Sequence, residues 1–281
     1  MLAVMEKETQ YALITGASKG LGYELARALA RRNINLLLVA LPGEDLAGKS
    51  KIIKNDYGVS VFWFECDLTR EKELNDLVLW VKENYTINML INNAGMGCTT
   101  KFSQTSRQEI DQILLLNIRS VALLTHGLLP LLANQHQSYI LNIASLAAFL
   151  PMPYKSVYPA SKAFVYSFSR GLCAELKDTN VFVSVAHPGG MATNPDVCRR
   201  ISKADWFTRA TILSIEKTAE ICVRGLLKKQ PLIIPGAMNK MVWLLTRLSP
   251  VSLQLRYLRS DFRKEITSTQ KSDIIFTKEK S

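Results

Sequence analysis

Short apolar runs alternate with longer stretches of helical periodicity through most of this chain, and this alternation restricts its fold more than any other feature. The runs that read as strands are Tyr11–Thr15, Ile34–Ala40, Val59–Phe64, Ile87–Ile91, Tyr139–Ala144, Val181–Ala186 and Leu232–Ile234. Helices are predicted after the first run and near residues 45–56, 70–84, 105–133, 156–178 and 215–229. Near-continuous apolar strands separated by helices are typical of a parallel sheet covered on both faces. We therefore expect an α/β fold with one doubly wound parallel sheet of about seven strands over residues 1–236.

The pattern changes after Ile234, where a basic amphipathic segment begins. One predicted apolar stripe, on a helix that ends at Pro250, consists of Met238, Met241, Val242, Leu245 and Leu248. A second stripe, with arginines beside it, is formed by Val251, Leu255, Leu258 and Phe262. Residues 199–281 hold seventeen Lys or Arg against seven Asp or Glu, and so carry nearly all of the net charge of +11. We expect 237–265 to be a helical extension of the same domain and 266–281 to be a mobile tail.

Cysteine and histidine usage argues against disulfides and metal ions. The five cysteines are scattered without a Cys-x-x-Cys spacing, which indicates free thiols in a reducing compartment. None of the three histidines has ligand spacing, so no metal site is expected.

The first ten residues lack the apolar stretch of a signal peptide, and the apolar window Val121–Ala133 is too short to cross a bilayer. These features predict a cytoplasmic protein, soluble or peripheral to a membrane. The basic last third has no recognisable nucleic-acid motif, and no nucleic-acid partner is expected.

A glycine-rich run, Thr-Gly-Ala-Ser-Lys-Gly-Leu-Gly over residues 15–22, joins the first predicted strand to the first helix. At such a junction Gly16 permits a tight turn, Gly20 lets the backbone approach a pyrophosphate, and Gly22 allows close packing of helix on strand. Free N–H groups at the helix start supply positive potential for phosphates. Glycines also occur in βα turns for structural reasons alone. Three at this spacing in the first βα unit nevertheless favour a dinucleotide site in a Rossmann-type fold.

Tyr158 and Lys162 stand one helical turn apart, so they would share a face of the predicted helix. A free phenol titrates near pH 10, too high for easy proton exchange at neutrality. A nearby ammonium favours the phenolate and would draw the pKa of Tyr158 toward the working range. Taken alone, this spacing is more often an ordinary pair of helix residues.

The remaining motifs follow in a fixed order along the chain. They are Cys66-Asp67-Leu68, Asn92-Asn93-Ala94-Gly95, Asn117, Ser145, Tyr158-x-x-x-Lys162, Pro188-Gly189 and Thr193. With the glycine run, this ordered set resembles the short-chain dehydrogenase/reductase family over residues 11 to about 235. The resemblance implies an NAD(P)-dependent oxidoreductase acting on carbonyls and alcohols. We also expect a homodimer or homotetramer.

The resemblance places the cofactor. The phosphate loop would contribute Gly16, Ser18, Lys19, Gly20, Leu21 and Gly22. Asp67 and Leu68 would border the adenine, Asn93, Ala94 and Gly95 would line the adenosine ribose, and Pro188, Gly189 and Thr193 would hold the nicotinamide carboxamide. Two structural alternatives stay open: Asp67 could cap the helix that begins near Arg70, and 92–95 could simply be a turn.

The choice between NADP and NAD depends on few residues. A carboxylate at the end of the second strand would bind the ribose 2′-hydroxyl and repel a 2′-phosphate. Ala40 and Leu41 occupy that position, while Lys19 could pair with a 2′-phosphate. An arginine that many NADP-dependent members carry at the position of Leu41 is missing. The sequence favours NADP, with NAD as the alternative.

The resemblance also assigns the chemistry. Tyr158 would protonate the carbonyl oxygen as hydride arrives from the nicotinamide, and Ser145 would donate a hydrogen bond to that oxygen. Lys162 would hold the nicotinamide ribose and lower the pKa of Tyr158, and Asn117 would hold a water that relays protons to Lys162. Pro159, next to Tyr158, suits the first helical turn if Ser156 is the N-cap, because its missing N–H has no partner there.

Of the parts of the predicted function, the substrate is the one that the sequence specifies least. Bulky apolar residues in 146–154 and 191–207 should flank the nicotinamide and favour an apolar carbonyl substrate, although Arg199, Arg200 and Lys203 could meet an acidic group. The alternative function is a non-catalytic dinucleotide-binding sensor or scaffold. The basic C-terminal helices would pack on the core, cover the substrate mouth, form a dimer contact or lie on an anionic membrane.

Overall fold

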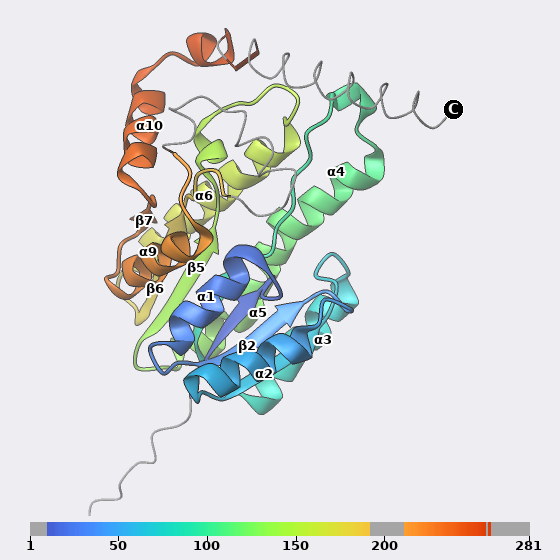
Figure 1. Ribbon diagram of the computed structural model, residues 1–281, viewed down its shortest axis with the longest axis vertical. Coiled ribbons are helices and arrows are strands. Elements are labelled where there is room, and N and C mark those ends of the chain that lie inside the picture. The colour runs from blue at the N-terminus through green and yellow to red at the C-terminus, as the bar shows by residue number, and fades with distance from the viewer. Residues whose placement is uncertain (1–9, 192–210, 257, 260–281) are drawn as a thin grey trace, which may run out of the picture.

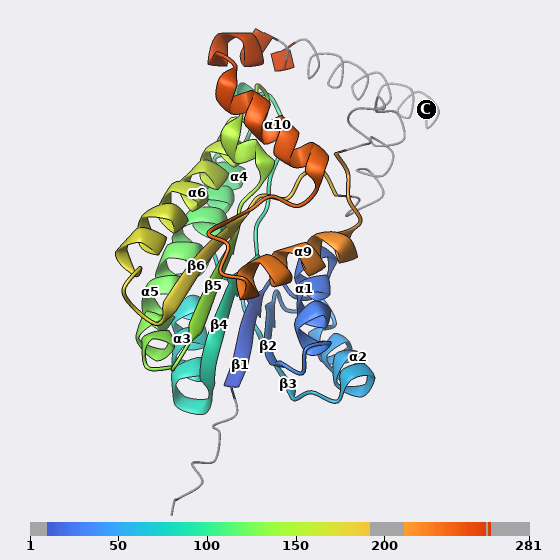
Figure 2. The ribbon, with the colours of Figure 1, turned by 90° about the vertical axis from the view of Figure 1, so that its left-hand side faces the viewer.

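Seven parallel strands form the centre of the molecule, in the order β3-β2-β1-β4-β5-β6-β7 (Figures 1 and 2). The computed structural model describes residues 10–191, 211–256 and 258–259. The strands are β1 Gln10–Thr15, β2 Asn35–Ala40, β3 Val61–Glu65, β4 Thr86–Asn92, β5 Ser138–Ile143, β6 Val181–Ala186 and β7 Leu232–Ile233. The strand order reverses between β1 and β4, and a crevice opens beyond the carboxyl ends of strands at such a point.

Helices cover both faces of this sheet, as Figure 2 shows. One layer consists of α1 Gly20–Ala30, α2 Leu46–Tyr57 and α9 Ile215–Leu227. The other consists of α3 Glu71–Asn84, α4 Arg107–Leu114, α5 Ser120–Ala133 and α6 Val157–Glu175. Side chains alternate along each strand, so β2 sends Leu36 and Leu38 to the first layer and Leu37 and Val39 to the second. Burial on both faces explains why the strands read as continuous apolar runs.

The predicted strands and helices are confirmed, mostly to within one or two residues of their observed ends. The main difference lies in the predicted helix over 105–133. It is continuous, but residues Leu115–Arg119 form a π-helical turn between α4 and α5. At 27 residues, the stretch Arg107–Ala133 is long and apolar enough to cross a membrane by length and composition. Leu124, Leu128 and Leu132 of this stretch are buried in the cluster that packs on this face of the sheet.

The C-terminal extension begins with α10 Ala237–Leu248, which ends before Pro250 as predicted. Its stripe differs from the predicted one: Met238 and Val242 lie on the half-buried side of the helix, whereas Met241, Leu245 and Leu248 are exposed. The helix lies beside the 3-10 turn η3 Leu146–Phe149, and the rings of Trp243 and Phe149 are 6.3 Å apart. The tail predicted at 266–281 lies outside the described residues.

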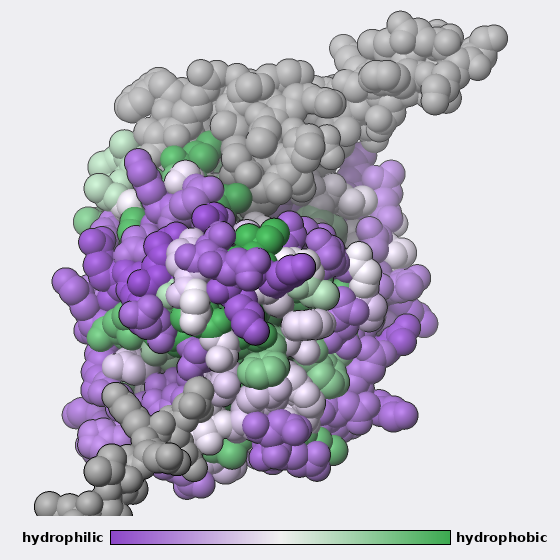
Figure 3. Space-filling view, turned by 60° about the horizontal axis from the view of Figure 1, so that its bottom comes forward, coloured by the Kyte–Doolittle hydropathy of each residue, from purple (hydrophilic) through white to green (hydrophobic). Residues whose placement is uncertain are grey.

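The face seen in Figure 3 is mainly hydrophilic, and hydrophobic residues appear on it as small separate groups. Scattered apolar residues of this kind are ordinary on a protein surface. The exposed apolar residues of α10 are different because they follow one another along a single helix.

Candidate functional site

The glycine-rich run forms the turn between β1 and α1 at the crevice. Gly16 and Gly20 have φ of 65° and 57°, a region that favours glycine. A Cβ on Gly22 would lie 2.5 Å from Nδ2 of Asn93 and closer still to the Gly16 carbonyl oxygen, so only glycine fits there. Helix α1 starts without a side-chain cap, which leaves its first N–H groups for another acceptor. These observations agree with the predicted roles of Gly16 and Gly22.

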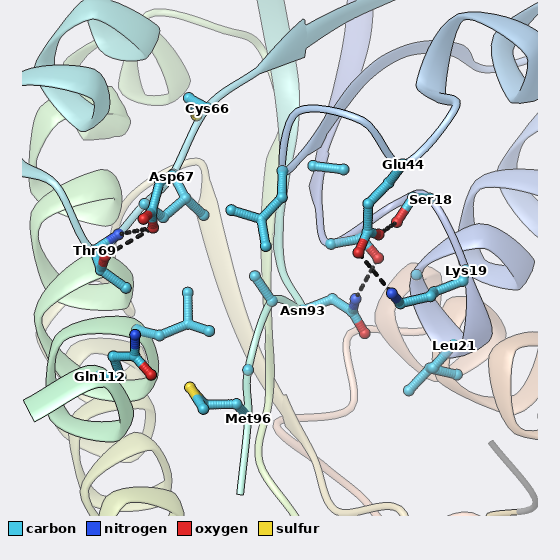
Figure 4. Close-up of a pocket in the computed structure, with 18 residues that line it drawn as sticks. Ser18, Lys19, Leu21, Glu44, Cys66, Asp67, Thr69, Asn93, Met96 and Gln112 are labelled. Atoms are coloured by element: carbon cyan, nitrogen blue, oxygen red, sulfur yellow. Dashed lines mark hydrogen bonds and ion pairs between the residues drawn. The ribbon is translucent and has the colours of Figure 1, made fainter. Parts of the chain in front are cut away.

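A cavity of about 530 Å³ lies against this turn (Figure 4). Most predicted cofactor residues line it, namely Gly16, Ser18, Lys19, Leu21, Gly22, Asp67, Leu68, Asn93, Ala94 and Gly95. Gly20, Tyr158, Lys162, Pro188 and Gly189 are not among its lining residues, and Thr193 lies outside the described residues. Ala40 and Leu41, which the sequence places beside the ribose, also line it, as does Cys66 of the Cys66-Asp67-Leu68 motif. Sequence reasoning missed the other lining residues: Glu44, Thr69, Met96, Gln112 and Leu116.

Two of the predicted cofactor residues, Asn93 and Ala94, hold the cavity wall together. Asn93 donates through Nδ2 to the carbonyl oxygens of Thr15 and Gly16, at 2.9 and 3.2 Å, and so fixes the glycine turn. The hydroxyl of Thr15 accepts from the backbone N–H groups of Asn93 and Ala94, both at 3.0 Å. The segment after β4 is therefore a fixed wall of the cavity and more than a simple turn.

Asp67 does not cap the next helix. Its Oδ1 accepts from the backbone N–H and hydroxyl of Thr69 at 2.9 and 2.7 Å, which closes a turn ahead of α3. The N-cap position of α3 is Arg70, which makes no side-chain cap bond. Asp67 keeps its place on the cavity wall next to Leu68.

Glu44 is the most informative residue that sequence reasoning missed. It follows β2 by four residues, and its carboxylate bonds to the hydroxyl of Ser18 and, at 2.6 Å, to Nζ of Lys19 (Figure 4). The Lys19 ammonium and then the Ser18 hydroxyl lower the pKa of this carboxyl, which stays ionised at neutral pH. Two of the predicted phosphate-loop residues are thus engaged by an acidic partner.

Beyond the cavity, the Ser145 hydroxyl lies near the Tyr158 phenol and lowers its pKa. Ser145 precedes η3, and its hydroxyl accepts from the backbone N–H of Ala147 at 3.1 Å. Helix α6 begins at Val157, so Tyr158 and Pro159 lie in its first turn, as predicted. Ser156 occupies the N-cap position but makes no side-chain cap bond.

The protonation of Tyr158 differs from the sequence expectation. Burial raises the pKa of Tyr158, and the nearby Ser145 hydroxyl opposes that rise. Lys162 is not among the groups that shift the pKa of Tyr158. Its Nζ donates to the carbonyl oxygen of Ile143 at 2.9 Å. Burial lowers the pKa of Lys162 to about 8. In this structure Tyr158 is a neutral phenol, ready to donate a proton.

The loop after β4 packs on both predicted catalytic side chains of α6. A Cβ on Gly95 would lie 3.1 Å from Nζ of Lys162, and a Cβ on Gly97 would lie 2.8 Å from Cδ2 of Tyr158. The glycines therefore permit a close approach that positions Tyr158 and Lys162 at the end of the cavity wall.

Asn117 lies in the π-helical turn and is fully buried. Its Nδ2 donates to Met96 O at 2.8 Å and Ser161 Oγ at 2.9 Å, and its Oδ1 accepts from Met96 N at 2.9 Å. The side chain thus ties α6 to the loop after β4. Its predicted role in holding a water stays a prediction. A π turn at such a point is common near functional sites.

His187, at the end of β6, is a second residue that sequence reasoning missed. Its Nδ1 lies 2.8 Å from the carbonyl oxygen of Ser145, which can only accept, so Nδ1 carries the hydrogen. Burial lowers the pKa of His187 to about 4, which keeps the ring neutral. The ring contacts Phe149, with centroids 4.4 Å apart. His187 therefore fixes the backbone that presents the Ser145 hydroxyl.

Pro188 and Gly189 connect the site to α10. Pro188 O accepts from the Leu146 N–H at 3.0 Å, and a Cβ on Gly189 would lie 2.8 Å from the Asn239 side chain. Their predicted contact with a nicotinamide carboxamide stays a prediction. Among the residues that the structure describes, no group of three or more His, Cys, Asp or Glu could hold a metal ion.

The residues present fit a dinucleotide. The glycine turn and the uncapped start of α1 suit a pyrophosphate, and the long cavity beside them suits an adenosine. That a nicotinamide would extend from this cavity toward Ser145, Tyr158 and Lys162 stays a prediction.

Comparison with known proteins gives a consistent result. The family model described as short chain dehydrogenase matches residues 10–202. The chain is 33% identical over 219 residues to 17-beta-hydroxysteroid dehydrogenase type 3 from Mus musculus, covering 76% of this chain and 71% of that protein. It is 33% identical over 187 residues to very-long-chain 3-oxoacyl-CoA reductase from Anas platyrhynchos, covering 65% and 60%.

A solved structure is also similar. The short-chain dehydrogenase from Sphingobium yanoikuyae in complex with NADPH superposes with a TM-score of 0.74 at 29% identity, covering 83% of this chain and 91% of that one.

Proposed function

The chain belongs to the short-chain dehydrogenase family, and as its specific function we propose that it reduces an apolar carbonyl compound with a nicotinamide dinucleotide, or catalyses the reverse oxidation. The observation that carries this proposal is the grouping of Ser145, Tyr158 and buried Lys162 at the end of a cavity that suits a dinucleotide.

Each of these residues has a distinct task. The bound nicotinamide ring supplies or accepts the hydride. Tyr158, neutral because burial raises its pKa, donates its proton to the carbonyl oxygen. Ser145 donates a hydrogen bond to that oxygen as negative charge develops there, while His187 keeps the Ser145 backbone in place. Lys162 would hold the ribose hydroxyls of the bound dinucleotide.

An apolar substrate is supported by the residues after Ser145. Phe149, Leu150 and Met152 belong to a loop that lines a second cavity of about 470 Å³, whose walls are mainly apolar. The names of two relatives, a hydroxysteroid dehydrogenase and a very-long-chain 3-oxoacyl-CoA reductase, also refer to substrates with large apolar parts. The segment with Arg199, Arg200 and Lys203 lies outside the described residues, so the acidic-group alternative stays a prediction.

The choice of dinucleotide depends on two side chains of the first cavity. Lys19 supports NADP(H), as the sequence predicts, because its ammonium can pair with a 2′-phosphate. Glu44 supports NAD(H), because it supplies near the end of β2 the carboxylate that Ala40 and Leu41 lack. The function therefore includes both dinucleotides.

The C-terminal extension supports a proposed location of the protein at a membrane surface. On α10, the exposed residues Met241, Leu244, Leu245 and Leu248 recur at helical spacing on the outer side. No Asp or Glu occurs in residues 221–260, whereas this stretch holds seven Lys or Arg. We propose that this face, with Val251, Leu253 and Leu255, rests on an anionic membrane from which an apolar substrate reaches the site. A homodimer or homotetramer stays the expected assembly.

Carbonyl-dependent oxidation of NADPH or NADH by the purified protein is the test of the enzymatic function. Tyr158→Phe should abolish most turnover while leaving dinucleotide binding intact. Tyr139→Phe is the matched control, because it removes a hydroxyl at the opposite end of β5. Turnover in Tyr158→Phe equal to that of the control would exclude the proposed proton donor.

A further inference from the structure

Helix α10 lies beyond the carboxyl ends of the strands, next to the two segments that follow β5 and β6 (Figure 2). Its outer side is exposed, whereas Asn239 and Trp243, one helical turn apart, lie on its inner side. Asn239 faces the segment Pro188–Gly189, and Trp243 faces the turn η3. One helix therefore contacts both segments that flank the proposed reaction centre.

The contact between Asn239 and Gly189 is close. A Cβ on Gly189 would lie 2.8 Å from both Nδ2 and Oδ1 of Asn239, and the three atoms nearest to that Cβ all belong to this amide. Gly189 does not have the positive φ that favours glycine, so its own backbone conformation would accept a side chain. The Asn239 amide is therefore the group that excludes a side chain at this position.

The Asn239 side chain is held in one orientation. It is 1% exposed, and its Nδ2 donates to the carbonyl oxygen of Pro235 at 2.7 Å. Gly236 has a φ of 92°, a value that favours glycine, and turns the chain into α10. A Cβ on Gly236 would lie 3.3 Å from Nδ2 of Asn239. The amide is thus enclosed by the turn that starts α10 and by Gly189.

A buried amide is a poor choice for a position that only fills space. Its Oδ1 is buried without a hydrogen-bond partner in the part of the chain that the structure describes. An apolar side chain of similar size would fill the same space and leave no polar atom unpaired. Native proteins keep few such atoms, and departures of this kind are expected at functional sites. The location of Asn239 therefore points to the segment that its amide contacts.

The contact made by Trp243 determines where α10 lies. Its ring is 6.3 Å from the ring of Phe149, which contacts the ring of His187 with centroids 4.4 Å apart. His187 in turn bonds to the carbonyl oxygen of Ser145. Through these rings α10 packs on the turn that presents the Ser145 hydroxyl, so the position of Asn239 is tied to that of Ser145.

We propose that Asn239 is a positioning residue for the nicotinamide. Its amide fixes the segment Pro188–Gly189, which the sequence predicts to hold the nicotinamide carboxamide, relative to Ser145 and Tyr158. A displacement of about 1 Å between reacting groups can reduce the rate by about 100-fold. This inference rests on the proposed function, because it assumes that a nicotinamide lies against this segment.

The test is Asn239→Ala in the full chain, which removes the amide that contacts Gly189. We expect kcat for carbonyl-dependent oxidation of NADPH or NADH to fall at least about tenfold. The affinity for each dinucleotide, measured by cofactor fluorescence, should fall about fivefold, the factor for one weakened hydrogen bond. The affinities for 5′-AMP and 2′,5′-ADP, which lack the nicotinamide, should stay unchanged, whereas a general loss of structure would weaken all four ligands.

Asn84→Ala is the matched control. The Nδ2 of Asn84, at the end of α3, donates to the carbonyl oxygen of Trp80 at 2.8 Å, with the same four-residue spacing as Asn239 and Pro235. This control removes an equivalent bond away from the site and should leave kcat and every affinity unchanged. Asn239→Ser keeps a donor toward Pro235 but loses the contact with Gly189, so it should show the same fall in kcat and replaces Asn239→Ala if that variant does not fold.

A substitution at Gly189 tests the contact itself. Gly189→Ala alone places a methyl group against the Asn239 amide and should lower kcat. In Gly189→Ala with Asn239→Ala, the methyl group enters the space that the amide occupied. We therefore expect kcat of the double variant to exceed that of both single variants, whereas the losses from two independent sites would multiply.

The outcomes separate the two proposals. Suppose that Asn239→Ala keeps the wild-type kcat, that it weakens 5′-AMP as much as NADH, or that the two losses multiply in the double variant. Any of these results means that Asn239 does not position the nicotinamide, while the enzymatic function stands. If wild type shows no carbonyl-dependent oxidation of either dinucleotide, both the function and the inference are overturned.

Discussion

At the scale of single residues, the site depends on groups whose roles appear only after folding. Tyr158, Lys162 and Ser145 carry family motifs and are recognisable in the sequence. Glu44 and His187 are not, because each acts through a contact made by a chain reversal or a neighbouring strand. The direction of the Tyr158 pKa shift also required the structure, since it depends on the burial of the phenol and on the nearby Ser145 hydroxyl.

Burial of His187 makes a specific prediction about acid stability. Its pKa of about 4 in the folded protein lies below the unfolded value of about 6.5, so the unfolded chain binds more protons between these two pH values. The free energy of unfolding should therefore fall as pH falls through this window, with a contribution on the order of 3 kcal/mol from this group.

Denaturant unfolding at pH 7 and at pH 4.5 measures this contribution. His187→Asn keeps a donor toward Ser145 O but cannot be protonated, so it should lose less stability between the two pH values than wild type. His136→Gln, which changes an exposed histidine, should behave as wild type. Equal losses in wild type and His187→Asn would show that His187 is not buried in its neutral form.

At the scale of elements, most of the fold was predictable. Strands buried on both faces produce apolar runs that are hard to mistake, and Pro250 and the glycine run mark element ends. The π turn at Leu115–Arg119 was missed because it is a shift in hydrogen-bond register that the apolar pattern does not record. The sequence analysis placed the apolar residues of α10 in one stripe. In the structure they lie on both the inner and the outer face of the helix, so the exposure of the outer face was not predicted.

The loop after β4 makes a prediction at this scale. Gly97→Ala would place a methyl group 2.8 Å from the Tyr158 ring, and Tyr158 must move because the loop is held by Asn117. Small misplacements of a reacting group can reduce turnover by about 100-fold. We expect kcat to fall by about that factor while dinucleotide affinity changes less than about twofold.

Gly171→Ala is the matched control, because nothing lies within 4 Å of the added methyl group and α6 would gain helix propensity. Steady-state kinetics and cofactor fluorescence on both variants provide the comparison. Unchanged kcat in Gly97→Ala would mean that the loop does not position Tyr158.

At the scale of the whole molecule, the comparisons confirm a short-chain dehydrogenase fold with one sheet and one dinucleotide crevice. Its C-terminal face is apolar and basic and carries the membrane proposal. Truncation after Gly236 would be an unsuitable test of that face, because it also removes Asn239 and Trp243, which pack against the site.

Point substitutions test the membrane proposal more cleanly. Leu244→Ser with Leu248→Ser should weaken sedimentation with anionic vesicles, since both side chains are exposed and each buries apolar area in lipid. Ile52→Ser with Leu79→Ser changes two residues of α2 and α3 that are about half exposed, and should have no effect. Binding should fall as salt rises. Equal recovery with neutral and anionic vesicles would contradict the proposal.

The most direct test of the central claim is deuterium transfer. NADPH or NADH carrying deuterium at the reactive C4 position is incubated with the protein and an apolar ketone, and the alcohol is analysed by mass spectrometry. Wild type is predicted to give an alcohol with one deuterium on the carbinol carbon, and Tyr158→Phe almost none in the same time. Oxidation of the dinucleotide without deuterium in any alcohol, or equal transfer by Tyr158→Phe, would contradict hydride transfer with Tyr158 as the proton donor.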